Sequence, residues 1–343
     1  MSGDEPAASE PLIMNVKLDG HPVEMIVEAD RLDAAQRWSH YVIRGPLFGL
    51  AVREPGVSGW RMVTAMSDGF PQASRDALNS QLFFQAKDDT DDPALRLELL
   101  SAVRRLDREP VNELTVAGAR YRVIRGDEFF YIHDGTVEPP RPTDPDPAEP
   151  DWDLHAADPE LDGDVVIDHA AATGVMASAE RLSMLDLHYR STRYPADVRA
   201  DSRAALETHP GVVLLPAAFR VVQRTEDGWE PVLGIMSTPH AARRSLVDAL
   251  LTFWPRMYGL DADEKAEYAR AAEAFRSAGR ANELQVAGKQ FFVVRLGRVV
   301  RIGPDGPEPP RPSDVDPYGP SKIHPTMDEH GNITFDDEDE DDE

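Results

Sequence analysis

The chain has 343 residues, which exceeds one average domain and suits two domains of about 150 residues each. Hydrophobic residues make up 41% and charged residues 29% of it, a composition typical of folded proteins. Cysteine is absent, which excludes disulfides, thiol nucleophiles and cysteine-containing zinc sites. Residues 1–5 lack the basic and apolar regions of a secretion signal, and no segment has the roughly 18 apolar residues of a membrane span, so we expect a soluble cytoplasmic protein without a membrane partner.

The net charge of −26 is concentrated in two segments. Residues 143–168 and residues 327–343 each contain ten acidic side chains and no lysine or arginine, so the rest of the chain is only mildly acidic. Because blocks of like charge repel one another, we expect both segments to be mobile, and we expect deletion of residues 327–343 to leave the melting temperature unchanged. Duplex nucleic acid is excluded as a partner, since phosphate binding needs a basic face.

Two sequence words occur twice, each time 170 residues apart. NELTVAG at 112–118 returns as NELQVAG at 282–288, and EPPRPTD at 138–144 returns as EPPRPSD at 308–314. Weaker matches keep this spacing to within one residue, among them Trp60 with Trp229. The spacing predicts an internal duplication, that is, two diverged copies of one folding unit.

In chain order, the first copy is preceded by an expected strand pair that turns at Asp19-Gly20. Apolar periodicity and turn residues then predict a helix, a strand, a glycine-rich turn, a strand that opens at Trp60, two helices and a hairpin. The expected bounds are 13–27 for the strand pair, 29–38, 41–53, 71–87 and 93–108 for the next elements, and 114–116 with 120–124 for the hairpin. Gly118 follows Ala117 in the turn of this hairpin, where a positive φ is needed.

The second copy repeats this order. Its expected elements cover 200–208, 212–224, a strand that opens at Trp229, 239–257, 261–278, and the hairpin strands 284–286 and 290–294. We therefore predict an α+β fold of two similar units, each a small antiparallel sheet of hairpins packed with helices and related to the other by a pseudo-twofold. The predicted organisation is a first unit over 1–142 with its N-terminal hairpin, an acidic proline-rich linker over 143–163, a second unit over 164–320 and a disordered acidic tail over 321–343.

The NEL words supply the first candidate site residues. A functional interpretation places Asn112 with Glu113, and Asn282 with Glu283, at a site where a carboxylate and an amide meet a ligand. The favoured structural interpretation has each Asn end a helix in the left-handed conformation while each Glu pairs with an arginine across the hairpin. Arg125 and Arg295, at the ends of the following strands, are the expected partners of these acids.

The EPPRP words supply the remaining candidates. Polyproline segments dock on aromatic grooves of partner proteins, with Arg141 or Arg311 providing orientation. They also serve as stiff arms along their own domain, which is the interpretation we favour. The pairs Asp144/Asp146 and Asp314/Asp316 have the spacing of a D-x-D metal motif, yet they stand in an extended proline-rich stretch, and we predict no metal there.

Common catalytic motifs are absent from the sequence. It contains no P-loop, no G-x-G-x-x-G after a strand, no H-E-x-x-H, no G-x-S-x-G and no EF-hand loop. The ten histidines stand singly, without the spacing of a metal centre. We predict no cofactor, no metal and no catalytic residue.

Several of these segments together resemble an uncharacterised family. RGPLFGLAVRE at 44–54, LNSQLFF at 78–84, the NELTVAG word with the RYRV that follows it, and EPPRPTD are similar to a family of actinomycete, streptomycete-type proteins that share a domain of unknown function. The resemblance implies a bacterial cytoplasmic setting and supplies no activity and no site residues.

Two functional hypotheses from different classes remain open. The first is a non-enzymatic binding or regulatory protein, whose two units form one pseudo-symmetric surface for another protein. The second is a small-molecule enzyme or ligand sensor with a pocket between the units. A cleft lined by the candidate side chains favours the second, whereas flat strands and buried arginine–carboxylate pairs favour the first.

Overall fold

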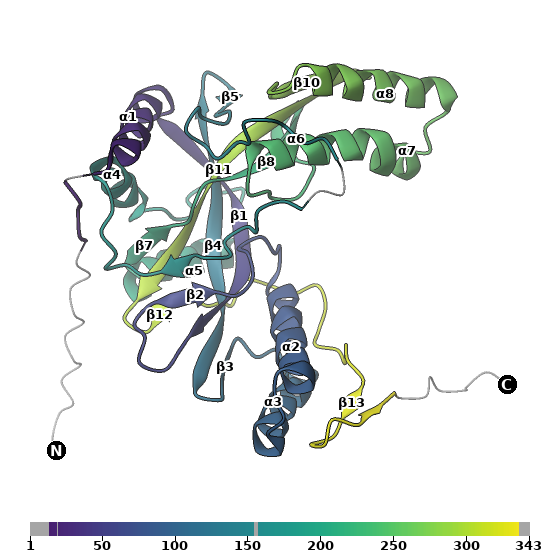
Figure 1. Ribbon diagram of the computed structural model, residues 1–343. Coiled ribbons are helices and arrows are strands. Elements are labelled where there is room, and N and C mark those ends of the chain that lie inside the picture. Colours follow the sequence, from purple (N-terminus) through teal and green to yellow (C-terminus); the bar gives the residue numbers. More distant parts are fainter. Residues whose placement is uncertain (1–13, 19, 154–156, 336–343) are drawn as a thin grey trace.

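A computed structural model describes residues 14–18, 20–153 and 157–335. One antiparallel sheet runs through the middle of the molecule, with neighbouring strands in the order β6-β2-β1-β4-β11-β8-β9 (Figure 1). Its strands are β1 (His40–Arg53), β2 (Trp60–Met62), β3 (Glu113–Val116), β4 (Ala119–His133), β5 (Thr136–Val137), β6 (Val166–Ile167), β7 (Gly211–Leu214), β8 (Ala218–Thr225), β9 (Gly228–Pro231), β10 (Glu283–Val286), β11 (Lys289–Gly303) and β12 (Gly306–Pro307).

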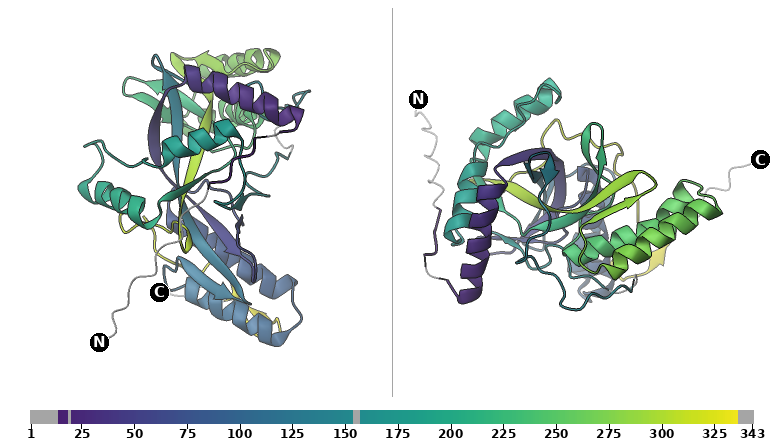
Figure 2. Two further views of the ribbon diagram at one scale, coloured as in Figure 1. Left: turned by 90° about the vertical axis from the view of Figure 1, so that its left-hand side faces the viewer. Right: turned by 90° about the horizontal axis from the view of Figure 1, so that it is seen from above.

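Helices lie at both ends of the sheet and beside it (Figure 2). They are α1 (Pro22–Arg37), α2 (Pro71–Asp88), α3 (Pro93–Leu106), α4 (Val175–Met184), α5 (Ala196–Thr208), α6 (Pro239–Asp248), a π-helical turn (Ala249–Phe253), α7 (Trp254–Met257) and α8 (Ala262–Ser277). The predicted α+β class is confirmed. Within the described ranges, no helix is long and apolar enough to cross a membrane.

The two longest strands, β4 and β11, join the sheet across its centre. They pair antiparallel over four positions, from Gly297 opposite Phe129 to Val300 opposite Gly126. Each strand begins in its own hairpin, β3–β4 or β10–β11, and the turns contain Ala117-Gly118 and Ala287-Gly288, all four residues at positive φ as the sequence predicts. We refer to residues 20–137 as the N-terminal half and to residues 196–307 as the C-terminal half; their strands belong to one sheet rather than to two separate ones.

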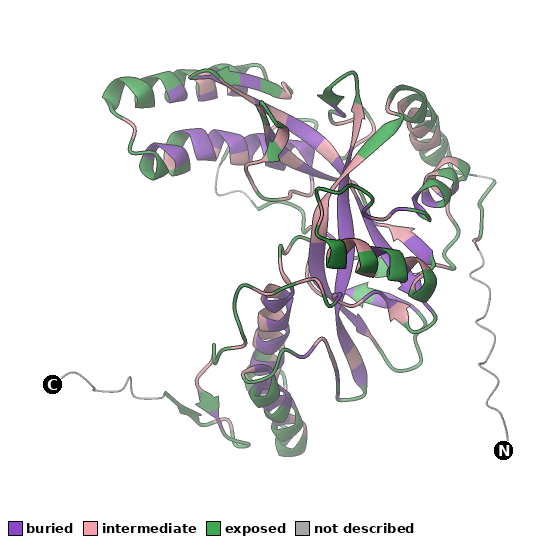
Figure 3. Cartoon of the chain, turned by 180° about the vertical axis from the view of Figure 1, so that it is seen from behind, coloured by how far each residue is buried: buried purple, intermediate pink, exposed green. Residues whose placement is uncertain are grey.

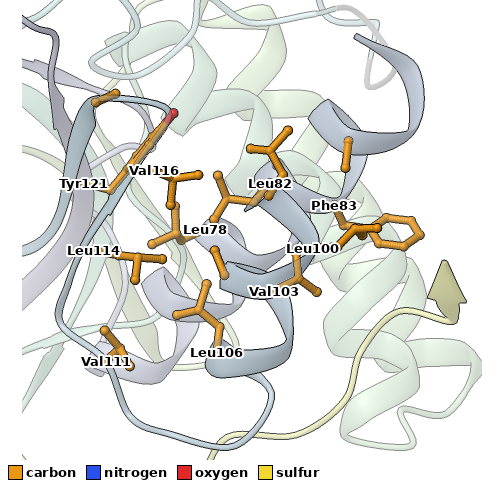
Figure 4. Close-up of a cluster of buried hydrophobic side chains, with 14 of the residues drawn as sticks. Leu78, Leu82, Phe83, Leu100, Val103, Leu106, Val111, Leu114, Val116 and Tyr121 are labelled. Carbon is orange, nitrogen blue, oxygen red and sulfur yellow. The ribbon is translucent and has the colours of Figure 1, made fainter. Parts of the chain in front are cut away.

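Each half has its own hydrophobic core. In the N-terminal half, side chains of α2 and α3 pack against β1, β3 and the start of β4, with Leu82 and Leu99 almost fully buried (Figure 4). In the C-terminal half, α6, α7 and α8 pack against β8, β10 and the start of β11. The strands between these cores are the most buried part of the chain, whereas the outer helices are mostly exposed (Figure 3).

The N-terminal strand pair expected over 13–27 is wrong, because α1 begins at Pro22. Pro22 stands in the first turn of the helix, where its missing N–H costs nothing. His21 caps the helix, its ring accepting from the Val23 amide, and the Glu24 carboxylate accepts from the His21 amide at 3.0 Å. The sequence thus carried a capping box that the turn residues Asp19-Gly20 obscured.

The acidic linker is held by ion pairs in its described part. Asp162 is buried and contacts Arg298 at 2.5 Å, and Asp158 contacts Arg244 at 2.6 Å. The expectation of a mobile segment fails here, since arginines of the C-terminal half provide the counter-charges that the local sequence lacks.

The segment 321–335 also packs on the molecule. It contains a hairpin, β13 (Thr326–Met327) with β14 (Ile333–Thr334), and Met327 is buried in the core of the N-terminal half. The His324 ring stacks on Phe83 with centroids 4.4 Å apart, and Arg96 donates to the Glu329 carbonyl at 3.0 Å. The expected disorder is therefore not met over 321–335, and the acidic run 336–343 lies outside the described residues.

Met327 offers a direct test of this packing. We expect Met327→Ala in the full chain to lower the free energy of unfolding by about 2–3 kcal/mol, because it removes a buried side chain from a core. Deletion of 327–343 should lower the melting temperature further. Urea and thermal unfolding measure both effects, and an unchanged stability of both variants would show that the hairpin does not pack.

Candidate functional site

The two EPPRP segments each lie on the opposite half of the molecule. We call residues 138–146 arm 1 and residues 308–316 arm 2. Arm 1 follows β4 and β5 of the N-terminal half, yet the Glu138 carbonyl accepts from the Arg295 amide of β11 at 2.9 Å. Arm 2 follows β11 and β12, and the Glu308 carbonyl accepts from the Arg125 amide of β4 at 2.8 Å. The two halves therefore exchange their arms.

The D-x-D pairs fasten the exchanged arms to arginines. In arm 1, Asp144 contacts Arg295 at 3.1 Å and Asp146 contacts Arg243 of α6 at 2.8 Å. In arm 2, Asp314 contacts Arg125 at 3.0 Å and Asp316 contacts Arg75 of α2 at 2.5 Å. Each aspartate thus has an arginine as its counter-ion, and no cluster of metal-ligating side chains occurs among the residues that the structure describes.

The asparagines of the NEL words belong to the same arginine clusters. Asn112 accepts from Arg75 at 2.6 Å, and Asn282 accepts from Arg243 at 2.7 Å. Neither asparagine has the left-handed conformation expected from the sequence. Each orients the arginine that binds the second aspartate of the opposite arm.

The predicted partners of Glu113 and Glu283 are wrong. Glu113 contacts Arg120 and Arg122, both at 2.6 Å across the β3–β4 hairpin, instead of Arg125. Glu283 is exposed and forms no ion pair with any described residue. Arg125 and Arg295 point instead to the arms, because the aspartates that cross from the other half reach them first.

Arg141 and Arg311 each pair with the glutamate at the start of their own arm. Arg311 binds both carboxylate oxygens of Glu308, at 2.7 and 3.0 Å. Arg141 binds only one oxygen of Glu138, at 2.6 Å, and the other oxygen is buried without a hydrogen-bond partner in the described chain. Burial raises the pKa of Glu138, and the charge of Arg141 offsets part of this rise.

The cluster around Arg125 is closed by side chains of the protein itself. Arg125 is 1% exposed and binds Asp127 at 3.0 Å, in addition to Asp314. The Tyr189 hydroxyl donates to Asp127 at 2.6 Å and lies 3.2 Å from a terminal nitrogen of Arg125. Burial raises the pKa of Tyr189, and the charge of Asp127 raises it further. We call Arg125, Asp127, Tyr189 and Asp314 the sealed cluster.

The matching cluster around Arg295 lacks these closing groups. The position 170 residues after Asp127 is Gly297, and the Phe129 ring occupies the space where its side chain would lie. Within the described ranges, Arg295 uses only its Nε in a side-chain hydrogen bond, so its two terminal nitrogens have no partner. We call Arg295, Asp144, Arg141 and Glu138 the open cluster.

Three cavities border the open cluster. Arg141 separates a cleft of about 420 Å³, lined also by Trp38, Trp229, Asn282 and Glu283, from a cavity of about 300 Å³ that is lined by Tyr131 and Glu180. Arg295 lines a third cavity of about 460 Å³. Helix α1 covers the first two, although none of its side chains is buried.

The structure thus divides the eight predicted site residues. Arg141, Asn282, Glu283 and Arg295 line cavities at the open cluster, Arg125 is in the sealed cluster, Asn112 and Arg311 support arm 2, and Glu113 stands apart. Sequence reasoning missed Glu138, Asp127 and Tyr189. The contrast between Asp127 and Gly297 at matching positions was available in the sequence, but the role of Tyr189 required the tertiary structure.

The matched aspartates of the two arms give a stability test. Asp314→Ala leaves the fully buried Arg125 without a partner for its Nε, and we expect a loss of about 3–5 kcal/mol. Asp144→Ala should cost less, because the Arg295 side chain is 12% exposed and borders a cavity, where water solvates it. Urea unfolding of both variants decides the point, and equal losses would contradict the distinction between the clusters.

Asp127 gives a test by pH. Burial alone would raise the pKa of Asp127, but the charges of Arg125 and Arg311 and the Tyr189 hydroxyl hold it below its ordinary value. A lowered folded-state pKa means that ionised Asp127 stabilises the fold above the unfolded value of about 3.9, and that this contribution is lost as the pH falls through the folded value.

We therefore expect Asp127→Asn to be less stable than the wild type at pH 7 by about 3–5 kcal/mol. The difference should shrink as the pH falls below about 4, because the wild type then loses the contribution that the variant already lacks. Urea unfolding across this range measures it, and parallel stability profiles would refute the assignment.

Comparison with known proteins assigns a family without an activity. The model of a family of unknown function (DUF5954) matches residues 21–317, a range that includes both arms and all three cavities. No curated protein and no solved structure matches the chain.

Proposed function

The chain belongs to the DUF5954 family of unknown function, and we propose that it is a non-enzymatic ligand-binding protein that senses a small molecule at the open cluster. The observation that carries the proposal is the difference between two otherwise matching arginine clusters. One is closed by Asp127 and Tyr189, whereas the other keeps unpaired guanidinium nitrogens beside cavities.

Unpaired polar groups in a largely buried environment carry a free-energy cost, which a ligand can remove. The volumes of about 420 and 460 Å³ fall in the range of small-molecule sites. Apolar walls with a few polar groups, as at Trp38, Trp229 and Arg141, are the usual composition of such sites.

The polar groups of the open cluster favour binding over chemistry. Glu138 and Asp144 are committed to Arg141 and Arg295, and no nucleophile lies in contact with a base among the groups that line these cavities in the described chain. Helix α1 is a suitable sensing element, since it is attached mainly by polar contacts, such as Arg31 with Glu180 at 3.1 Å and Asp30 with Thr143 at 2.6 Å.

The architecture that supports this role comes, in our proposal, from an internal duplication. Corresponding residues of the two arms make corresponding contacts at an offset of 170, and the pair of Glu128 with Arg298 lies at the centre of the β4–β11 register, where a pseudo-twofold would pass. The bacterial, actinomycete-type and cytoplasmic setting is part of the same proposal and rests on the sequence resemblance.

Blocking variants test the proposal. Ala34 of α1 lines the 420 and 300 Å³ cavities, and Ala171 lines the 460 Å³ cavity. Ala34→Trp and Ala171→Trp should each fill a cavity, whereas the matched variants Gln36→Trp and Ala170→Trp place the same ring at exposed neighbouring positions.

A library of cellular metabolites is screened against the full chain by ligand-observed NMR. We expect at least one compound that binds the wild type and both matched variants, and whose affinity falls at least about tenfold in one blocking variant. A screen without any binder, or binders that ignore both blocking variants, would overturn the proposal. A protein partner captured through the exposed side of α1, unaffected by both, would favour the surface-binding alternative.

A further inference from the structure

The sealed cluster shows what an arginine at this strand position binds. The side chain of Arg125 meets three oxygen groups, which are the Asp314 and Asp127 carboxylates and the Tyr189 hydroxyl. Asp314 comes from the exchanged arm, and Asp127 is a second carboxylate on the same strand. A guanidinium binds carboxylates through its planar array of N–H donors, and charge-assisted bonds of this kind are the strong ones.

Arg295 has the first of these carboxylates and lacks the second. Asp144 takes the place of Asp314, at 3.1 Å from Nε. Gly297 stands where Asp127 would be, and no described residue accepts from the terminal nitrogens of Arg295. A carboxylate that enters from the 460 Å³ cavity would supply the missing acceptor.

A second arginine in this cavity also lacks a carboxylate partner. Arg181 of α4 donates to the Val212 and His169 carbonyls, both at 3.1 Å, and no described carboxylate lies within ion-pair distance of it. Burial lowers the pKa of Arg181, and the more distant charge of Asp168 counters this only in part. The other arginines of the cavity, Arg31 and Arg298, are neutralised by Glu180 and Asp162.

The walls of the cavity define the rest of the ligand. Phe129, Val213 and Leu215 provide apolar surface, which suits a carbon skeleton attached to the carboxylate. Asp168 and Glu180 also line the cavity and repel negative charge, so a singly charged anion fits better than a polyanion such as phosphate.

We infer that the ligand is a small organic monocarboxylate whose carboxylate group binds Arg295 and Arg181 in the 460 Å³ cavity, in the place that Asp127 fills in the sealed cluster. This inference rests on the proposed ligand-binding function and specifies its chemistry. The apolar part of the ligand lies against Phe129.

The test uses benzoate as the probe, with inorganic phosphate and benzylamine as comparison probes. Each is titrated at millimolar concentration into the full chain and followed by NMR. We expect saturable binding of benzoate alone. Arg295→Lys keeps a charge for Asp144 but loses the planar array of donors, and Arg181→Gln removes the second charge; each should weaken benzoate binding at least about tenfold.

The sealed cluster provides the matched control. Arg125→Lys makes the same change at the matching position and should leave benzoate affinity unchanged, even where it lowers the melting temperature. Melting curves confirm that each variant is folded, and Arg181→Gln decides the outcome if Arg295→Lys is not. Benzoate binding that neither variant weakens, or the absence of benzoate binding, would overturn the inference.

The two proposals fail in different ways. If the metabolite screen yields ligands that Ala34→Trp or Ala171→Trp blocks, but these are cations, neutral molecules or phosphates, the binding function stands and only the carboxylate inference fails. If no compound of any charge binds, both fail together.

Discussion

The structure depends on the ion pairs that join each exchanged arm to an arginine of the opposite half. Arg125 and Arg295 stand on the two strands that run through the whole sheet, and the aspartates that reach them, Asp314 and Asp144, come from the other half of the chain. A buried arginine without its carboxylate is costly, whereas a well-placed pair is tolerated. Each half is therefore complete only when the arm of the other half is in place, which couples the two hydrophobic cores across the sheet.

The same arrangement explains how nearly equivalent clusters come to differ in role. Additional carboxylate and hydroxyl groups satisfy Arg125, so its cluster contributes to stability and leaves no room for a ligand. At Arg295 the corresponding carboxylate is replaced by Gly297, and the space beside it remains a cavity. One substitution in a symmetrical framework can thus convert a structural ion-pair network into a candidate binding site, without change to the arm contacts that hold the fold.

Local sequence patterns predicted the helices and hairpins well wherever apolar periodicity and turn residues agreed. Proline at the first turn placed α2, α3 and α6, and Ala-Gly pairs placed both hairpin turns. The pattern failed at α1, which buries no side chain and so has no apolar stripe to reveal it. It also failed for the acidic linker and for residues 321–335, because their counter-charges and apolar partners lie more than 100 residues away.

The sequence by itself determined the α+β class, the repeated words and most element positions, because these follow from interactions between residues that are close along the chain. Only the tertiary structure decided that the arms are exchanged, that Glu113 binds Arg120 and Arg122 while Arg125 binds Asp314, and that one arginine cluster is sealed and the other open. The physical reason is that a carboxylate and a guanidinium pair according to their separation in space and their burial. Both quantities are set by how β4 and β11 pair, and no periodicity in the chain encodes that register.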